Sequence, residues 1–168
     1  MSPDFEKKRE TDNVSEIRPT VHMTSDLIKT AYAGSIVYPP GGTFGPRIQK
    51  DVQLVMLHSG SLTLYLDDER HDVTPGTMLL LKPGHREHFL FSKTEDSWHR
   101  WITCVVGDLP ESLAESLERM PFMLPLADTM NRIVDVMLAC QSHSSPAHDR
   151  LMRTLALSAL QLFEAGSH

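Results

Sequence analysis

The stretch VTPGTMLLLKPGHREHFLFSKTEDSWHRWIT, residues 73–103, is the most informative part of the sequence about the expected fold. Two Pro-Gly turns bracket a short apolar run, and Pro-Gly is a strong turn signal. The stretch ends in a predicted strand, in which residues two apart share a face. His99, Trp101 and Thr103 therefore point the same way. An aromatic surface beside an imidazole and a hydroxyl suits a small polar ligand, so the stretch predicts β-structure with a binding pocket.

Similar short runs continue on both sides of this stretch and fill residues 26–107. Runs rich in Val, Ile, Leu, Thr and Tyr are separated by turns rich in Gly, Pro and acidic residues. No helical periodicity interrupts them, which disfavours alternating βαβ units. We therefore predict a small β-barrel or sandwich, with strands over residues 30–38, 52–58, 61–66, 71–74, 77–81, 85–92 and 98–106.

From residue 108 onward the apolar period becomes helical, so residues 108–168 are predicted to form two to three helices. Asp108 is expected to cap the first helix, with Pro110 in its first turn. Ser145 and Pro146 mark the start of the last helix. The helix between them is expected to bury one apolar stripe, formed by Leu126, Met130, Ile133, Met137 and Cys140.

The last helix carries a wide apolar face made of two neighbouring stripes. They are Leu151, Leu155, Ser158 and Leu162, and beside them Met152, Ala156, Ala159 and Phe163. A face this wide can cover one sheet of the β-domain, or it can also pair with a second copy of the chain. The spacing leaves both alternatives open. If the chain forms a homodimer, Leu151, Leu155 and Leu162 are the predicted contacts.

The composition is that of one globular domain without a membrane partner. At 168 residues the chain is long enough to bury a core, and no apolar run approaches the roughly 20 residues of a membrane helix. The polar leader, residues 1–25, is expected to be a flexible arm without a secretory signal. Cys104 and Cys140 lie far apart in apolar settings, as is typical of reduced thiols. The cytoplasm is the expected location.

The charge distribution argues against direct binding to nucleic acid. The net charge is −6, and the one dense basic run, Lys7-Lys8-Arg9, lies in the leader and is followed by acidic residues. Proteins that bind nucleic acid usually need a basic stripe that displaces counterions from the phosphates. We therefore expect this chain alone not to bind DNA.

Several of these motifs, in this order, resemble the N-terminal effector-binding and dimerisation domain of AraC-type transcriptional regulators. They are YPPGG at 38–42, the hairpin at Gly60, the strand after Pro75-Gly76, KPGHREHF at 82–89 and DSWHRW at 96–101. The resemblance spans residues 30–164. It implies a mainly β fold, a cupin-like β-barrel of the double-stranded β-helix or jelly-roll type. It also implies an N-terminal arm, and C-terminal helices through which two subunits pair.

Carried over by position, the resemblance implies an effector site. Trp101 would be the platform on which the effector stacks, and His99 a hydrogen-bonding neighbour. His88 takes the place of the histidine that follows the Pro-Gly turn. Arg47, just after the YPPGG segment, is a candidate contact to an anion or hydroxyl, and Thr103 shares the face of Trp101. The predicted partner is a small-molecule effector: a sugar, a small organic acid or an aromatic compound.

The sequence departs from the family pattern at two places. Phe89 stands where the arabinose-responsive member has a polar aromatic residue, so the effector need not be arabinose. Family members also continue into a DNA-reading module of two helix-turn-helix units, and this chain ends at His168 without one. Contact with DNA is therefore expected only through a module that this chain lacks.

Cupin resemblance also raises a metal-dependent enzyme as an alternative. Catalytic cupins usually hold a metal through a His-x-His pair and a Glu on one hairpin, with another His on a later strand. Here the first hairpin offers only His58, although His88 fits the later position and His85 and His99 are nearby in sequence. We therefore predict no metal, no cofactor and no catalytic residue. A free-standing cupin that only binds a ligand is the other alternative.

Overall fold

The structure is a computed structural model that describes residues 22–168. Within these residues a short 3₁₀ turn, η1 (Ser25–Leu27), precedes nine strands and three α-helices. Most of the predicted arm, residues 1–25, lies outside the described residues.

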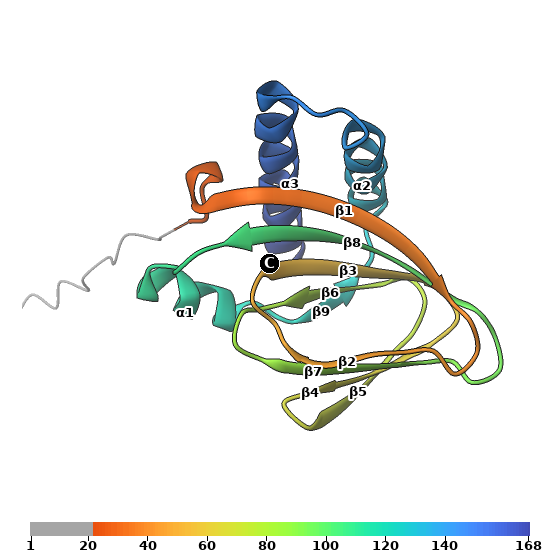
Figure 1. The fold of residues 1–168 in the computed structure, drawn as a ribbon. Coiled ribbons are helices and arrows are strands. Elements are labelled where there is room, and N and C mark those ends of the chain that lie inside the picture. Colours follow the sequence, from red (N-terminus) through yellow and green to blue (C-terminus); the bar gives the residue numbers. More distant parts are fainter. Residues whose placement is uncertain (1–21) are drawn as a thin grey trace, which may run out of the picture.

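Two antiparallel sheets face each other and form a jelly roll (Figure 1). The five-stranded sheet has the order β1-β8-β3-β6-β9, with strands Ile28–Tyr38 (β1), Ser97–Val106 (β8), Val52–Ser59 (β3), Thr77–Leu81 (β6) and Met123–Pro125 (β9). The four-stranded sheet has the order β2-β7-β4-β5, with strands Thr43–Ile48 (β2), Arg86–Phe91 (β7), Leu62–Leu66 (β4) and Glu69–Val73 (β5). The predicted double-stranded β-helix fold with C-terminal helices is confirmed.

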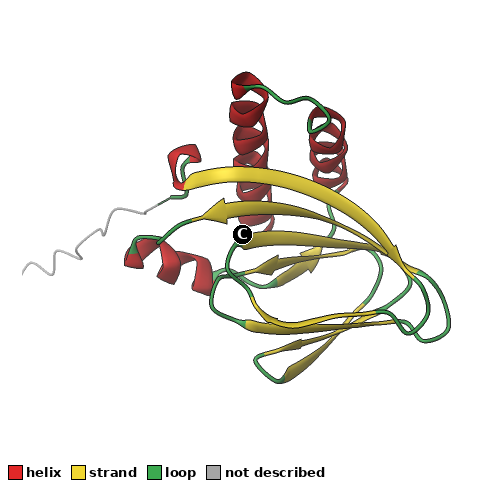
Figure 2. Cartoon of the chain, viewed as in Figure 1, coloured by secondary structure: helices red, strands yellow, loops and turns green. Residues whose placement is uncertain are grey.

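The helices are α1 (Glu111–Arg119), α2 (Asp128–Cys140) and α3 (Pro146–Gly166). Helices α2 and α3 pack on β1 and β8, on the outer face of the five-stranded sheet, and α1 lies at one end of the barrel (Figure 2). None of the helices in residues 22–168 is both long and apolar enough to cross a membrane.

Strand β3 shows how this layering produces two hydrophobic cores. Successive side chains on a strand point to opposite faces. Leu54 and Met56 join the cluster beneath α2 and α3, whereas Val55 and Leu57 join the cluster between the two sheets. Both faces of β3 are thus covered, and the strand reads as a continuous apolar run rather than an alternating one.

The hairpin between β4 and β5 shows how a short turn sets strand register. Leu66 pairs with Glu69, so only Asp67 and Asp68 form the turn. Both have positive φ angles, 49° and 66°. A two-residue turn with positive φ at both positions matches the right-handed twist of the flanking strands. Asp tolerates this backbone region better than most residues with a β-carbon.

Gln141, just after α2, closes part of the free edge of β1. Its side-chain oxygen accepts from the Ala33 N–H at 2.9 Å, and its side-chain nitrogen donates to the Ala33 carbonyl at 2.8 Å. The carboxamide thus takes the place of a neighbouring strand at this position. Closing an edge in this way protects a sheet from pairing with other chains.

Two strands and one helix cap differ from the sequence prediction. Strand β2 was not predicted because Gly45-Pro46 interrupts its pattern, and β9 has only three residues. The N-cap of α1 is Pro110, without a side-chain hydrogen bond, so the predicted cap by Asp108 is wrong. The predicted start of α3 is confirmed, since Ser145 accepts from the backbone N–H of His148.

The two apolar stripes of α3 are covered to different extents. Met152, Ala156, Ala159 and Phe163 are buried against the sheet. Leu155 and Leu162 are half-buried against the same cluster, whereas Leu151 is 40% exposed. Covering the sheet therefore accounts for the first stripe and for part of the second.

Candidate functional site

A cavity of about 330 Å³ opens between the two sheets. Residues from both sheets line it: Tyr32, Ile36, Tyr38, Phe44, Arg47, Gln53, Val55, Phe89, His99 and Trp101. This volume lies within the range typical of small-molecule sites, which combine apolar walls with a few polar groups. The polar groups of this cavity gather at one end and the aromatic rings along its walls.

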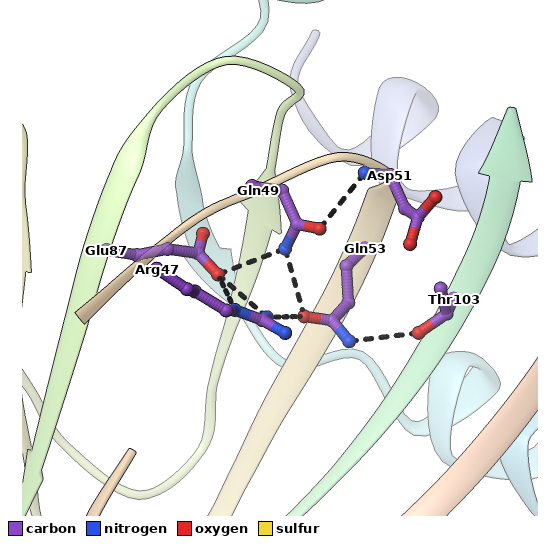
Figure 3. Close-up of polar contacts among 6 residues, drawn as sticks. All are labelled: Arg47, Gln49, Asp51, Gln53, Glu87 and Thr103. Atoms are coloured by element: carbon purple, nitrogen blue, oxygen red, sulfur yellow. Dashed lines mark hydrogen bonds and ion pairs between the residues drawn. The ribbon is translucent and has the colours of Figure 1, made fainter. Parts of the chain in front are cut away.

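Arg47 organises the polar end (Figure 3). Its Nε donates to Oε1 of Glu87 at 2.7 Å, and its Nη2 donates to Oε1 of Gln53 at 2.8 Å. Gln49 supports both acceptors, at 3.0 Å from Glu87 and 3.3 Å from Gln53. Gln53 in turn donates to the Thr103 hydroxyl at 2.9 Å. These bonds fix the guanidinium in place without using all of its N–H groups, which leaves donors for a ligand.

Burial and charge act in opposite directions on Glu87. The residue is fully buried, and this burial raises the pKa of its carboxyl, while the Arg47 charge and the hydrogen bonds from Arg47 and Gln49 lower it. Only Oε1 is bonded: the buried Oε2 has no hydrogen-bond partner within residues 22–168. A buried charge needs such partners, so the position of Arg47 and the ionisation of Glu87 depend on each other.

Trp101 forms the aromatic wall on the five-stranded sheet. It pairs with Gly34 in the β1–β8 register, and its indole fills the space beside that glycine: a β-carbon on Gly34 would lie 2.1 Å from Cζ2 of Trp101. On the four-stranded sheet, Phe44 and Phe89 have ring centroids 5.9 Å apart, and the Arg47 guanidinium lies 4.6 Å from the Phe44 ring centroid. The cavity therefore has aromatic surfaces on both sides.

His99 is a buried histidine that packs among aromatic rings. Its ring stacks on Phe91 and on Tyr38, at centroid distances of 5.3 and 5.6 Å, and it lies 5.4 Å from the Trp101 ring. The buried Nδ1 has no partner within the described part of the chain. Burial, with a smaller contribution from the charge of His58, lowers the pKa of His99 to about 4. The ring is thus neutral near pH 7 and can offer one donor and one acceptor.

Apolar side chains at the cavity rim are partly exposed. Tyr32, Ile36 and Phe44 are 45%, 38% and 40% exposed, although all three are large and apolar or aromatic. A cluster of exposed apolar groups beside a cavity is typical of a ligand-binding opening.

The structure brings together most of the predicted site residues. Arg47, His99 and Trp101 line the cavity. Thr103 lies on the same face of β8 but is buried behind Gln53, to which it is hydrogen-bonded. His88 is the exception. It lies on the opposite face of β7 from Phe89, beside Tyr65 and Arg86 on the outside of the barrel, and we leave it out of the proposed site.

Several residues that line the cavity, or that hold Arg47 in place behind it, were not found from the sequence. Gln53 lies in the continuous apolar run of β3, where no alternation shows which face is inside. Glu87 could have been found, because it precedes Phe89 and Phe91 by two and four residues on a strand and so shares their inward face. Tyr38, Phe44 and Gln49 flank turns whose geometry the sequence alone does not specify.

The histidines that raised the metal question point to different places. His58 accepts from Nε of Arg100 at 2.8 Å on the helix side of the sheet, and His85 lies at the barrel end beside α1. His88 is on the outside of the barrel and His99 on the inside. Among residues 22–168, no three His, Cys, Asp or Glu side chains converge as they would around a metal ion.

Comparison with known proteins gives one family match and a set of distant structural similarities. A family model described as the AraC-like ligand binding domain matches residues 31–160. The sequence comparison with curated proteins returned no match. Similar solved structures include an RmlC-like cupin from Shewanella frigidimarina, with 11% identity and a TM-score of 0.42 over 47% of this chain and 69% of that one.

Two further structures have comparable similarity. A Cupin 2 conserved barrel domain protein from Salinispora arenicola has 18% identity and a TM-score of 0.41, over 60% of this chain and 76% of that one. A protein from Thermotoga maritima, described as a predicted oxalate decarboxylase, has 12% identity and a TM-score of 0.41, over 44% and 65% of the two chains.

Proposed function

Because this chain belongs to the AraC-like ligand-binding domain family, we propose that it is the effector-sensing domain of an AraC-type transcriptional regulator and not an enzyme. The observation that carries the proposal is the cavity between the sheets, with aromatic walls and a fixed guanidinium at one end. Such a cavity can bind and orient a small molecule. The part of its lining that residues 22–168 supply offers no nucleophile hydrogen-bonded to a base, the arrangement that covalent catalysis requires.

The arrangement of the lining supports a particular pose for the effector. A flat apolar face of the ligand would stack on Trp101, opposite Phe89. An acceptor group such as a hydroxyl or carboxylate would reach the free donors of Arg47. His99, which also lines the cavity, would supply one further hydrogen bond from its ring. Sugars, small organic acids and aromatic compounds can each meet these requirements.

Strand β8 offers a route by which ligand binding in the cavity affects α2. Arg100 lies between His99 and Trp101 in sequence, and its side chain points to the other face of the strand. There it contacts Asp135 and donates to Asn131 at 3.0 Å, both on α2. An effector shifts a conformational equilibrium only by its difference in affinity for the two states. We propose that the placement of α2, and of the leader, differs between the ligand-free and bound states.

We further propose that the domain is a homodimer that pairs through the outer surface of α2 and α3. Val136 on α2 is 47% exposed and Leu151 on α3 is 40% exposed. A shallow apolar groove between these helices is lined in part by Ile133 and Leu162. Pairing along one shared surface is the usual geometry of a twofold homodimer.

The proposed setting is the cytoplasm, with both cysteines reduced. Cys104 and Cys140 are unpaired, and burial raises the pKa of the Cys104 thiol to about 12, which makes it unreactive.

The regulator role is tested by reading the gene beyond the codon for His168. A frame that continues into two helix-turn-helix units supports the proposal, and a stop codon contradicts the regulator role while leaving the ligand site standing.

The ligand site is tested by a thermal-shift screen of pentoses, hexoses, small carboxylates and aromatic acids. The screen uses the wild type, Trp101→Leu, and the control Trp98→Leu, whose side chain lies on the outer face of the same strand. A compound bound in the cavity raises the melting temperature of the wild type and the control, but not that of Trp101→Leu. A shift that survives in Trp101→Leu places the ligand elsewhere.

A further inference from the structure

His85, at the turn between β6 and β7, lies between two carboxylates from different elements. Its Nδ1 contacts Oδ2 of Asp67, in the β4–β5 turn, and its Nε2 is 2.7 Å from Oε1 of Glu118 on α1. The carboxylates meet opposite edges of the imidazole, so the three side chains do not surround a common point that could hold a metal ion. Each carboxylate instead faces one of the two ring nitrogens of His85.

The two contacts require the charged form of the ring. A neutral imidazole carries one N–H, and its other nitrogen is an acceptor. An acceptor facing a carboxylate is repelled, so only the imidazolium can donate to Asp67 and Glu118 together. The hydrogen bond to Asp67 and the hydrogen bond to Glu118 accordingly raise the pKa of His85, against a lowering by burial. The bond from His85 is also the main cause that lowers the pKa of Asp67.

Other hydrogen-bonding and charged groups lie around His85, Asp67 and Glu118. The Arg86 backbone N–H donates to Oδ1 of Asp67 at 2.9 Å, which fixes that carboxylate. Burial lowers the pKa of Lys82, against a raising by the charge of Glu118. The charge of His85 lowers the pKa of buried Glu87, against a larger raising by burial. The remaining charged residues on or next to these elements are all exposed: Asp68, Glu69, Arg86, Glu111, Glu115 and Arg119.

The Glu118 contact fastens the end of α1 to the barrel. Helix α1 buries only Leu113 and Leu117. Its last carbonyls are held by Lys82, whose Nζ donates to the Met120 carbonyl at 2.6 Å and to the Glu118 carbonyl at 3.3 Å. Loss of the His85 contact would therefore loosen α1 without detaching it.

The same residue adjoins the polar end of the ligand cavity. The backbone N–H of Gln49 donates to the His85 carbonyl at 2.9 Å. The side chain of Gln49 donates to Glu87, the carboxylate that holds Arg47. One continuous set of hydrogen bonds thus joins the turn that carries His85 to the guanidinium in the cavity.

We propose that His85 is a proton-dependent latch, whose imidazolium ties α1 to the β4–β5 turn and whose deprotonation releases Glu118 beside the polar end of the cavity. The latch does not depend on which effector the cavity binds. It adds a response to pH that the proposed sensing role does not include.

The direction of the pH response follows from the two shifts. The pKa of His85 is raised above 6.5, so the latch is closed below pH 6.5 and opens as the pH rises through the folded-state pKa. The pKa of Asp67 is lowered below 3.8, so acid opens the Asp67 contact only below that value. Between these limits the contact between His85 and Asp67 is made.

The test is a histidine-resolved NMR titration of the whole chain combined with hydrogen exchange of α1, corrected for the intrinsic pH dependence of exchange. We expect His85 to titrate above the ordinary imidazole range. We also expect the protection of α1 amides to fall about two- to fivefold between pH 5.5 and 8.5, the factor that corresponds to loss of one exposed ion pair.

Two variants complete the test. In Glu118→Gln, His85 should titrate lower than in the wild type, and the protection of α1 should no longer depend on pH. Glu115→Gln, one turn earlier on the same helix and exposed, is the matched control and should behave as the wild type. A wild-type His85 that titrates at or below 6.5, or α1 protection that is independent of pH, would overturn the proposal, and neither result depends on a variant.

Discussion

Gly34 and Trp101 are paired across β1 and β8, and the indole occupies the space that a side chain on Gly34 would need. A β-carbon at this glycine would lie 2.1 Å from Cζ2 and 2.4 Å from Cε2 of the indole. Real atoms do not approach so closely, so the aromatic wall of the cavity requires a glycine on the neighbouring strand. The position of Trp101 is thus encoded in two strands that are distant in sequence.

Gly34→Ala should displace the indole and destabilise the fold. Overpacking of this kind costs about 1–3 kcal/mol, and the fluorescence of Trp101 should change because the ring must move. Urea unfolding and emission spectra measure the two effects. Gly166→Ala is the control, since its nearest neighbour would be Leu124 at an ordinary 3.8 Å. Wild-type stability and emission in Gly34→Ala would contradict the described packing.

Arg100→Met should weaken the attachment of α2 to the sheet. The side chain is 9% exposed and bonds to His58, Asn131 and Asp135, so its loss should lower the free energy of unfolding by about 1–2 kcal/mol. Urea unfolding measures this difference. Arg132→Met removes an ion pair with Asp128 whose side chains are 76% and 74% exposed, and it should change stability by less than about 0.5 kcal/mol. Equal effects of the two variants would contradict the conclusion that Arg100 attaches α2 to the sheet.

His99 should make the fold less stable in acid. Its pKa is 6.5 in the unfolded chain and about 4 in the folded protein, so the unfolded state binds more protons between these values. Stability should therefore fall as the pH drops from 6.5 to 4, by about 3 kcal/mol in total from this residue. Unfolding curves of the wild type and His99→Phe at pH 7 and pH 4.5 measure the effect.

Phenylalanine can keep the stacking on Tyr38 and Phe91 but cannot bind a proton. His99→Phe should therefore lose less stability in acid than the wild type does. The pH range of measurement, from 7 to 4.5, also separates the contribution of His99 to stability from that of His85, because the contribution of His85 changes above pH 6.5. If both proteins lose the same stability between pH 7 and 4.5, His99 is not buried as a neutral ring.

Leu151→Asp should weaken the proposed homodimer without unfolding the chain. Leu151 is 40% exposed in the single chain, so a charge there is solvated in the monomer but buried at an interface. We expect the dissociation constant to rise roughly tenfold or more, measured by analytical ultracentrifugation. Leu155, half-buried in the core, is the poorer choice because Leu155→Asp would also disrupt packing. Val37→Asp, an exposed site on β1, is the control.

The sequence predicted the fold more fully than the site, for reasons that particular residues show. The Pro-Gly turns and the run from Trp98 to Thr103 define strands locally, and these strands formed as expected. Strand β2 was missed because its pairing with β7 depends on distant residues such as Glu87, opposite Arg47. Local periodicity carries no information about such a partner.

The same limit applied within the site. His88 was assigned by its position in a family pattern, although the inward face of β7 is fixed by Phe89 and Phe91. The strand period of two places His88 on the opposite face. Gln53 could not have been assigned, because both faces of β3 are buried. Its role appears only when Arg47 is brought beside it.

An NMR titration of the indole N–H signals, with the compounds that raise the melting temperature, tests most directly whether the effector binds inside the barrel. The chain has two tryptophans. Trp101 lines the cavity, whereas the indole N–H of Trp98 donates to Ser35 on the outer face of the sheet. We predict that a bound effector shifts the Trp101 signal and leaves the Trp98 signal unchanged. A stabilising ligand that leaves Trp101 unperturbed would contradict a binding site in the barrel.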